Sequence, residues 1–169
     1  MDLIDLKQQI YDEALSASDR EHAFYNYWIH RATSSDELSN GELSEMLSFS
    51  QWINPIGEII SYLCEGNKLN KDNISFVKNR LLLDSFAFKQ LTALEYLHSS
   101  LDWKSKYAHA KELKANWAIS KILRSVPAEE LEDARLFIAA QDLGKNTKRW
   151  QLEILSQTQQ KDNASKNSS

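Results

Sequence analysis

Residues 67–126 read NKLNKDNISFVKNRLLLDSFAFKQLTALEYLHSSLDWKSKYAHAKELKANWAISKILRSV and contain neither glycine nor proline. The two flanks hold all four glycines and both prolines, and Gly66 and Pro127 border the stretch directly. Glycine and proline are the strongest breakers of regular secondary structure. A stretch of this length without them, rich in Leu, Ala and Lys, predicts two long helices.

The first predicted helix spans about residues 73–99. Asp72 or Asn73 is a suitable N-cap, because its side-chain oxygen can accept a hydrogen bond from a free N–H group of the first turn. Polar side chains recur at steps of three, four and seven, which return to one helix face. They are Lys78, Ser85, Lys89, Thr92 and Ser99. The rest of the circumference is mainly apolar, so we expect this helix to be buried on several sides as the hub of an all-α bundle.

The second predicted helix begins at Asp102 and ends near Ser125. An apolar stripe that includes Trp103 and Tyr107 lies opposite a basic stripe. The basic stripe comprises Lys104, Lys111, Lys114, Lys121 and Arg124. Clustered cations attract acidic protein surfaces and neutralise phosphates. These five side chains are therefore the candidate binding site that the sequence predicts.

Shorter helices are expected on both sides of this pair, giving six or seven helices in one domain over residues 1–156. A chain of 169 residues with 42% hydrophobic side chains is large enough to build one core. The aromatic block Phe24–Trp28 is expected in that core. Residues 157–169 are polar except for one Ala, so they are predicted to form a disordered C-terminal tail.

The formal net charge of −4 conceals an uneven distribution. Residues 1–66 contain twelve acidic and three basic side chains, a net charge of −9, whereas residues 67–126 contain eleven basic and five acidic ones, a net charge of +6. The two fields could cancel where the helices pack, or one face could attract a charged partner. Pairing of an acidic half with a basic half between two copies would produce a homodimer.

Several chemical signatures are missing from the sequence. The glycines are scattered singly, so no phosphate-binding loop is present, and no Ser lies in a Gly-flanked turn. Cys64 is the only cysteine, which excludes an intramolecular disulfide, fits a reducing compartment and predicts a buried thiol. No apolar run reaches the ~18 residues of a membrane span. We expect a cytoplasmic protein without a cofactor, a membrane partner or enzymatic activity.

Two spacings allow a metal-binding alternative. Glu95 and His98 form an E-x-x-H pair, and Asp19 and His22 form a D-x-x-H pair. Such i, i+3 pairs share one helix face and bind two irons in ferritin-like bundles, together with two further carboxylates. No matching pair of additional Glu residues stands out, so we predict no metal ligands.

The sequence therefore favours a non-enzymatic protein–protein interaction module, such as an adaptor, an inhibitor or an accessory subunit. Its partner would be a protein, and an acidic one if the basic stripe binds it. A nucleic-acid-associated accessory protein that uses the same stripe is the alternative, and a ferritin-like metal protein is a more distant one. Self-association as a homo-oligomer is compatible with each of them.

Overall fold

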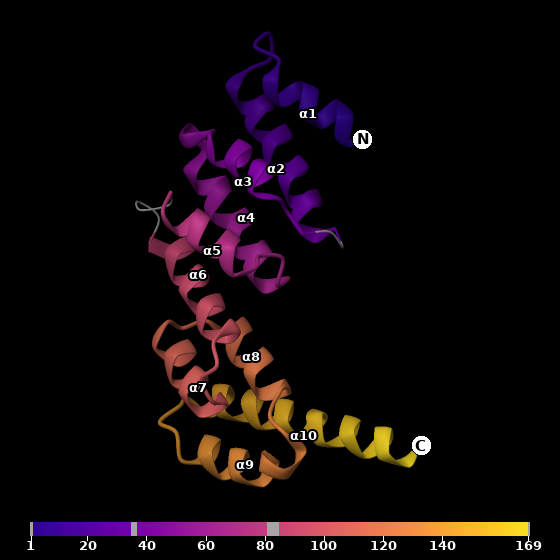
Figure 1. Ribbon diagram of the computed structural model, residues 1–169, viewed down its shortest axis with the longest axis vertical. Coiled ribbons are helices and arrows are strands. Elements are labelled where there is room, and N and C mark those ends of the chain that lie inside the picture. Colours follow the sequence, from indigo (N-terminus) through magenta and orange to yellow (C-terminus); the bar gives the residue numbers. More distant parts are fainter. Residues whose placement is uncertain (1, 35–36, 81–84, 169) are drawn as a thin grey trace. The chain divides into compact units, whose positions relative to one another are not determined.

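A computed structural model describes residues 2–34, 37–80 and 85–168 (Figure 1). These ranges contain ten α-helices, two short 3₁₀-helices and no strand, which confirms the all-α fold class. The chain divides into two compact units, residues 1–98 and residues 99–169, here called unit 1 and unit 2. The expectation of one domain over residues 1–156 stays a prediction.

Unit 1 is built from six α-helices and one 3₁₀-helix within its described residues. They are α1 (Leu3–Tyr11), α2 (Ala17–Thr33), α3 (Asn40–Leu47), η1 (Ser50–Trp52), α4 (Ile53–Glu65), α5 (Lys71–Lys78) and α6 (Ser85–His98). The helix α4 packs against both α2 and α6, while α1 packs on α2 and α5 on α6 (Figure 1). The helix α4 therefore holds the position at the centre of unit 1.

Aromatic side chains from α2 and η1 form the core beside α4. The ring of Phe24 lies 4.9 Å from that of Trp52, and Trp52 stacks on Phe49 at 5.2 Å. Phe24 and Trp28 are fully buried, as predicted for the block 24–28. Buried aromatic side chains contribute strongly to core energetics because each removes a large apolar area from water. This core fixes α2 and η1 around the start of α4.

The predicted continuous helix over residues 73–99 is wrong. The helix α5 begins after Asn70, whose side chain accepts from the N–H of Asn73 at 2.9 Å, and it ends at Lys78. The N–H of Arg80 donates to Val77 O at 3.0 Å, and the Arg80 guanidinium donates to Phe76 O at 3.2 Å. If the α-helix continued, the backbone N–H of Arg80 would donate to Phe76 O. In the structure the Arg80 side chain donates to that carbonyl instead. The predicted apolar run 81–83 lies outside the described residues.

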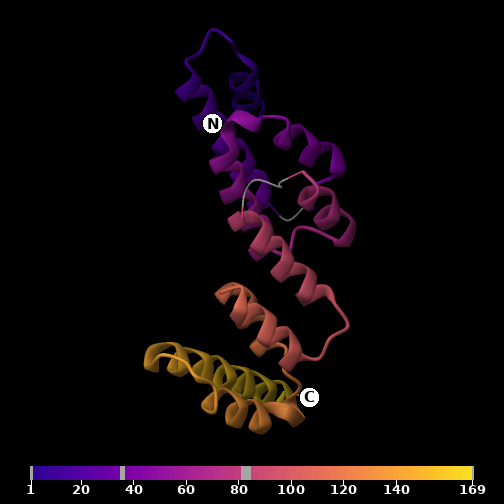
Figure 2. The ribbon, with the colours of Figure 1, turned by 90° about the vertical axis from the view of Figure 1, so that its left-hand side faces the viewer.

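Unit 2 contains four α-helices and one 3₁₀-helix in its described part. They are α7 (Trp103–Glu112), α8 (Asn116–Arg124), η2 (Ala128–Glu130), α9 (Leu131–Ala139) and α10 (Lys145–Asn167). The helix α8 packs against both α7 and α10, and α9 runs beside α10 (Figure 2). Tyr107, Ile122 and Leu155 are buried in the core that these four helices share.

The predicted helix over residues 102–125 is also divided. Lys114 adopts a left-handed backbone with φ = 56°. The N–H of Ala115 donates to Ala110 O and that of Lys114 to Lys111 O, which is the hydrogen-bond pattern of a Schellman C-cap. The chain therefore leaves α7 before Ala115 and begins a second helix, α8, that packs back on the first.

The helix α10 extends to Asn167, into the segment for which the sequence predicts disorder. Its last fully buried side chain is Leu155, yet the helical backbone continues to Asn167. Extension of an existing helix is far less costly than nucleation, so polar residues can follow a packed segment without a core of their own. None of the described helices in either unit combines the length and hydrophobicity that a membrane span requires.

Candidate functional site

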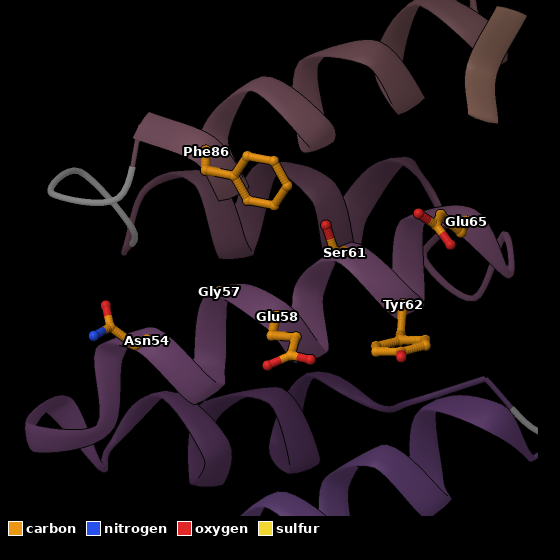
Figure 3. Close-up of a pocket in the computed structure, with 7 residues that line it drawn as sticks. All are labelled: Asn54, Gly57, Glu58, Ser61, Tyr62, Glu65 and Phe86. Atoms are coloured by element: carbon orange, nitrogen blue, oxygen red, sulfur yellow. The ribbon is translucent and has the colours of Figure 1, made fainter. Parts of the chain in front are cut away.

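An open groove of about 530 Å³ runs along α4 in unit 1 (Figure 3). Six of its described lining residues belong to α4 and one belongs to α6. They are Asn54, Gly57, Glu58, Ser61, Tyr62, Glu65 and Phe86. Figure 3 shows Asn54 and Glu65 near the two ends of this stretch and Phe86 projecting from α6 toward α4. We call this feature the α4 groove.

The α4 groove follows from the amphipathic pattern of α4. Asn54, Glu58, Ser61 and Glu65 recur at steps of three and four, which places them on one side of the helix. The apolar side is directed into the core, where Ile56, Ile59, Ile60 and Leu63 are buried. Gly57 has no side chain, so only its backbone contributes to the groove.

The two aromatic side chains of the groove are unusually accessible. Phe86 is 58% exposed and Tyr62 is 41% exposed. The sequence predicts Phe86 on the buried face of the long central helix, and this expectation is wrong. Phe86 lies in the first turn of α6, and its ring is exposed instead. Large exposed apolar side chains at a concave surface are typical of binding sites.

Glu58 determines the electrostatics of the groove centre. Its Oε1 accepts a hydrogen bond from the Tyr25 hydroxyl at 2.9 Å, and this bond raises the pKa of Tyr25. In the part of the chain that the structure describes, Oε2 of Glu58 has no hydrogen-bond partner. Glu65 adds a second carboxylate, and the described lining contains no Lys, Arg or His. The groove therefore combines negative charge with exposed aromatic surface.

The predicted basic stripe does not lie along one continuous helix. Lys104 forms an ion pair with Asp133 of α9 at 2.7 Å. Lys111 donates to the side-chain oxygen of Gln141 at 3.2 Å. Two of the five cations are thus directed at neighbouring segments of unit 2.

The other three predicted cations lie at or after the break between α7 and α8. Lys114 occupies the left-handed position at the end of α7. The ammonium group of Lys121 lies 5.6 Å from the centroid of the Trp117 ring, and Arg124 donates to Ser120 Oγ. The break separates Lys104 and Lys111 from Lys121 and Arg124, which belong to different helices. The binding role of these five residues stays a prediction.

The candidate metal residues make other contacts. Glu95 forms an ion pair with Lys78, and Nε2 of His98 lies 2.7 Å from the side-chain oxygen of Asn67. Asp19 accepts from Ser16 Oγ at 2.8 Å in the first turn of α2. Within residues 2–34, 37–80 and 85–168, no three His, Cys, Asp or Glu side chains are grouped so that they could hold a metal ion.

Comparisons with protein families, with curated proteins and with solved structures found no match to this chain. The assignment of a function therefore depends on the residues themselves. Sequence reasoning missed the α4 groove, although the polar spacing from Asn54 to Glu65 was a usable signal. The contribution of Phe86 had no such signal, because it depends on where α6 begins.

Proposed function

We propose that this chain is a non-enzymatic protein-binding module, an adaptor, inhibitor or accessory subunit, and that the α4 groove is its binding surface. The exposed ring of Phe86 above a carboxylate-lined groove is the observation that supports this proposal. Protein interfaces are enriched in aromatic side chains, and a few of these contribute most of the binding free energy.

The dimensions of the groove are compatible with a segment of another protein. Asn54 and Glu65 lie eleven positions apart in α4, which corresponds to roughly 16 Å along the helix axis. That length accommodates about three turns of a bound helix or about five residues of an extended strand. Grooves beside helices are a recurrent mode of peptide recognition.

The nucleic-acid alternative has less support than protein binding. Phosphate binding without sequence specificity needs several cations on one accessible face. Lys104 and Lys111 already contact side chains of their own unit, and Lys104 is paired with a carboxylate. The accessible groove of unit 1 is lined by carboxylates, which repel phosphates.

Replacement of Phe86 by Ala tests the proposal. We expect Phe86→Ala to weaken binding of the principal protein partner about thirtyfold, which corresponds to about 2 kcal/mol for an aromatic hot spot. Partners would be identified by affinity capture with quantitative mass spectrometry, and the dissociation constant would then be measured by calorimetry with the purified partner.

Phe88→Ala is the matched control, since Phe88 is a 40% exposed aromatic residue on the same helix that does not line the groove. The partner should be recovered with the wild-type chain and with Phe88→Ala and be depleted with Phe86→Ala. Recovery of the same proteins by all three chains would refute the groove as the binding surface. Circular dichroism would verify that both variants retain their helix content.

A further inference from the structure

We infer that the α4 groove recognises a cationic peptide segment with one large apolar side chain. This inference rests on the proposed function and adds the chemical class of the partner. The bound segment would place a Lys or Arg side chain against the Glu58 carboxylate and its apolar side chain against Phe86 and Tyr62.

The charge of the groove selects for cations. Glu58 and Glu65 lie seven positions apart, two helical turns, so both carboxylates line the same side of α4. Oε2 of Glu58 has no hydrogen-bond partner among the described residues. Residues 1–98 contain fifteen acidic and eight basic side chains, a formal net charge of −7, so the wider field of unit 1 has the same sign. Such a field accelerates the association of a cationic partner.

The apolar surface of the groove requires more than charge from its partner. Phe86 projects from α6 toward α4, and the neighbouring position Gly57 presents no side chain (Figure 3). The backbone at Gly57 is itself buried, so an apolar side chain of the partner would pack against the exposed rings of Phe86 and Tyr62. Contact with the rings removes exposed aromatic area from water, which adds a favourable term that salt does not screen.

Other occupants are less compatible with these residues. An acidic segment would bring like charges close to Glu58 and Glu65, which is unfavourable. A second copy of this chain is a weaker candidate, although residues 99–169 have a formal net charge of +3 from twelve basic and nine acidic side chains. Lys104 and Lys111 of that unit already contact residues of their own unit.

Three fluorescent helical peptides of equal length, each with one Trp, test this inference on the full chain. Their polar positions would be Lys, Gln or Glu, and their apolar positions identical. We expect the Lys peptide to bind at least tenfold more tightly than the Gln peptide at low salt, with the difference shrinking as salt screens the charges. The Glu peptide should not bind. Fluorescence anisotropy would report each dissociation constant.

Two double variants with equal charge changes distinguish the contribution of the groove carboxylates to binding from that of the overall negative charge of unit 1. Glu58→Gln with Glu65→Gln should weaken the Lys peptide about tenfold or more, and Phe86→Ala should weaken both the Lys and the Gln peptides. Asp5→Asn with Glu13→Gln removes the same charge from exposed positions at the N-terminal end of unit 1 and should have little effect. Equal losses in the two double variants would overturn the inference, because binding would then be nonspecific.

The remaining outcomes distinguish this inference from the proposed function. Equal, Phe86-dependent binding of all three peptides would overturn the cationic partner class and leave the groove as a protein-binding site. A dimer that sedimentation detects in the wild type but not in Glu58→Gln with Glu65→Gln would assign the groove to a second copy instead. The absence of any Phe86-dependent peptide or protein partner would refute both proposals.

Discussion

The candidate binding residues of the two units differ in how they present charge and aromatic surface. Unit 1 leaves Phe86, Tyr62 and the carboxylate of Glu58 at an open groove. Unit 2 directs Lys104 and Lys111 onto its own side chains and buries Tyr107 completely. The net charge of a segment therefore does not indicate which charged side chains are available to a partner. Some of them, such as Lys104, already pair with residues of their own unit.

The units also differ in how they satisfy buried polar groups. In unit 1 the buried amide of Asn73 is paired at both ends, with Asn70 N–H as donor at 3.2 Å and Asn40 Oδ1 as acceptor at 2.6 Å. In unit 2 Gln151 accepts from the Tyr107 hydroxyl at 2.6 Å, while its Nε2 has no partner among the described residues. Unit 2 therefore depends on a single buried side-chain hydrogen bond at this position.

The largest expected effect in the comparison is the loss of that bond. Tyr107→Phe should lower the free energy of unfolding of unit 2 by roughly 1–3 kcal/mol, since it leaves the buried amide of Gln151 without any partner. Tyr25→Phe removes a less buried bond in unit 1, where water can replace the hydroxyl, so its cost should stay within about 0.5 kcal/mol. Urea titration would measure both, combined with hydrogen exchange of α7 and α10 for Tyr107→Phe and of α2 and α4 for Tyr25→Phe.

A double variant identifies the cause of the loss. Replacing both partners by apolar groups is nearly neutral when the shapes match, so Tyr107→Phe with Gln151→Leu should recover most of the lost stability. If the double variant is less stable than Tyr107→Phe alone, the buried amide is not the source of the cost, and the two units do not differ in this respect.

A smaller effect is expected at the C-terminal caps, where the two units are alike. Both α4 and α7 end in a Schellman motif, with Asn67 at φ = 53° and Lys114 at φ = 56°. A left-handed backbone costs an ordinary L-residue roughly 1–2 kcal/mol, whereas Gly and Asn adopt it more readily. Lys114→Gly should therefore stabilise unit 2 by up to about 1 kcal/mol after the higher entropy of unfolded Gly is subtracted.

Asn67→Gly is the control for this prediction and should change the stability of unit 1 by less than Lys114→Gly changes that of unit 2. Thermal unfolding followed by circular dichroism would compare the two variants. A larger gain at Asn67 would show that the left-handed lysine is not strained, and the two caps would then be equivalent.

The smallest effect concerns alkaline pH. Partial desolvation, followed by the hydrogen bond to Glu45 at 2.7 Å, raises the pKa of the half-exposed Tyr11 from 10 to about 12. The unfolded chain therefore loses this proton at lower pH than the folded chain, so the associated stability is present below pH 10 and is lost as the pH rises to about 12. Tyr11→Phe should flatten the fall in stability over this interval.

Tyrosinate absorbance of the folded protein would check the assignment, since Tyr11→Phe should remove the component that titrates near pH 12. Burial also raises the pKa of Tyr107 in unit 2, so part of the alkaline dependence should remain in the variant. An unchanged titration curve would show that another tyrosine accounts for the high pKa.

Local patterns in the sequence predicted a large part of this fold. The buried thiol of Cys64 and the aromatic core of α2 both follow from residue type and spacing. These features depend on residues within a few helical turns, so sequence alone contains the required information.

The missed features depend on interactions that residue spacing does not encode. Lys114 adopts the left-handed conformation that Gly usually takes, and neither Asn79 nor Arg80 after α5 is a Gly or Pro, so neither break has a composition signal. The α4 groove needs two helices that are far apart in sequence and a separate start for α6. The exposure of Phe86 was therefore not predictable from the apolar pattern of residues 73–99.

The single cysteine has a practical consequence for kinetics. Cys64 is 0% exposed, lies in the core of unit 1, and has no counterpart in unit 2. A thiol reagent can modify it only when the surrounding helices open, so the rate of alkylation measures how often unit 1 opens. Unit 2 contributes no reactive thiol to that signal. Alkylation of Cys64 thus reports the opening of one of the two units without an engineered label.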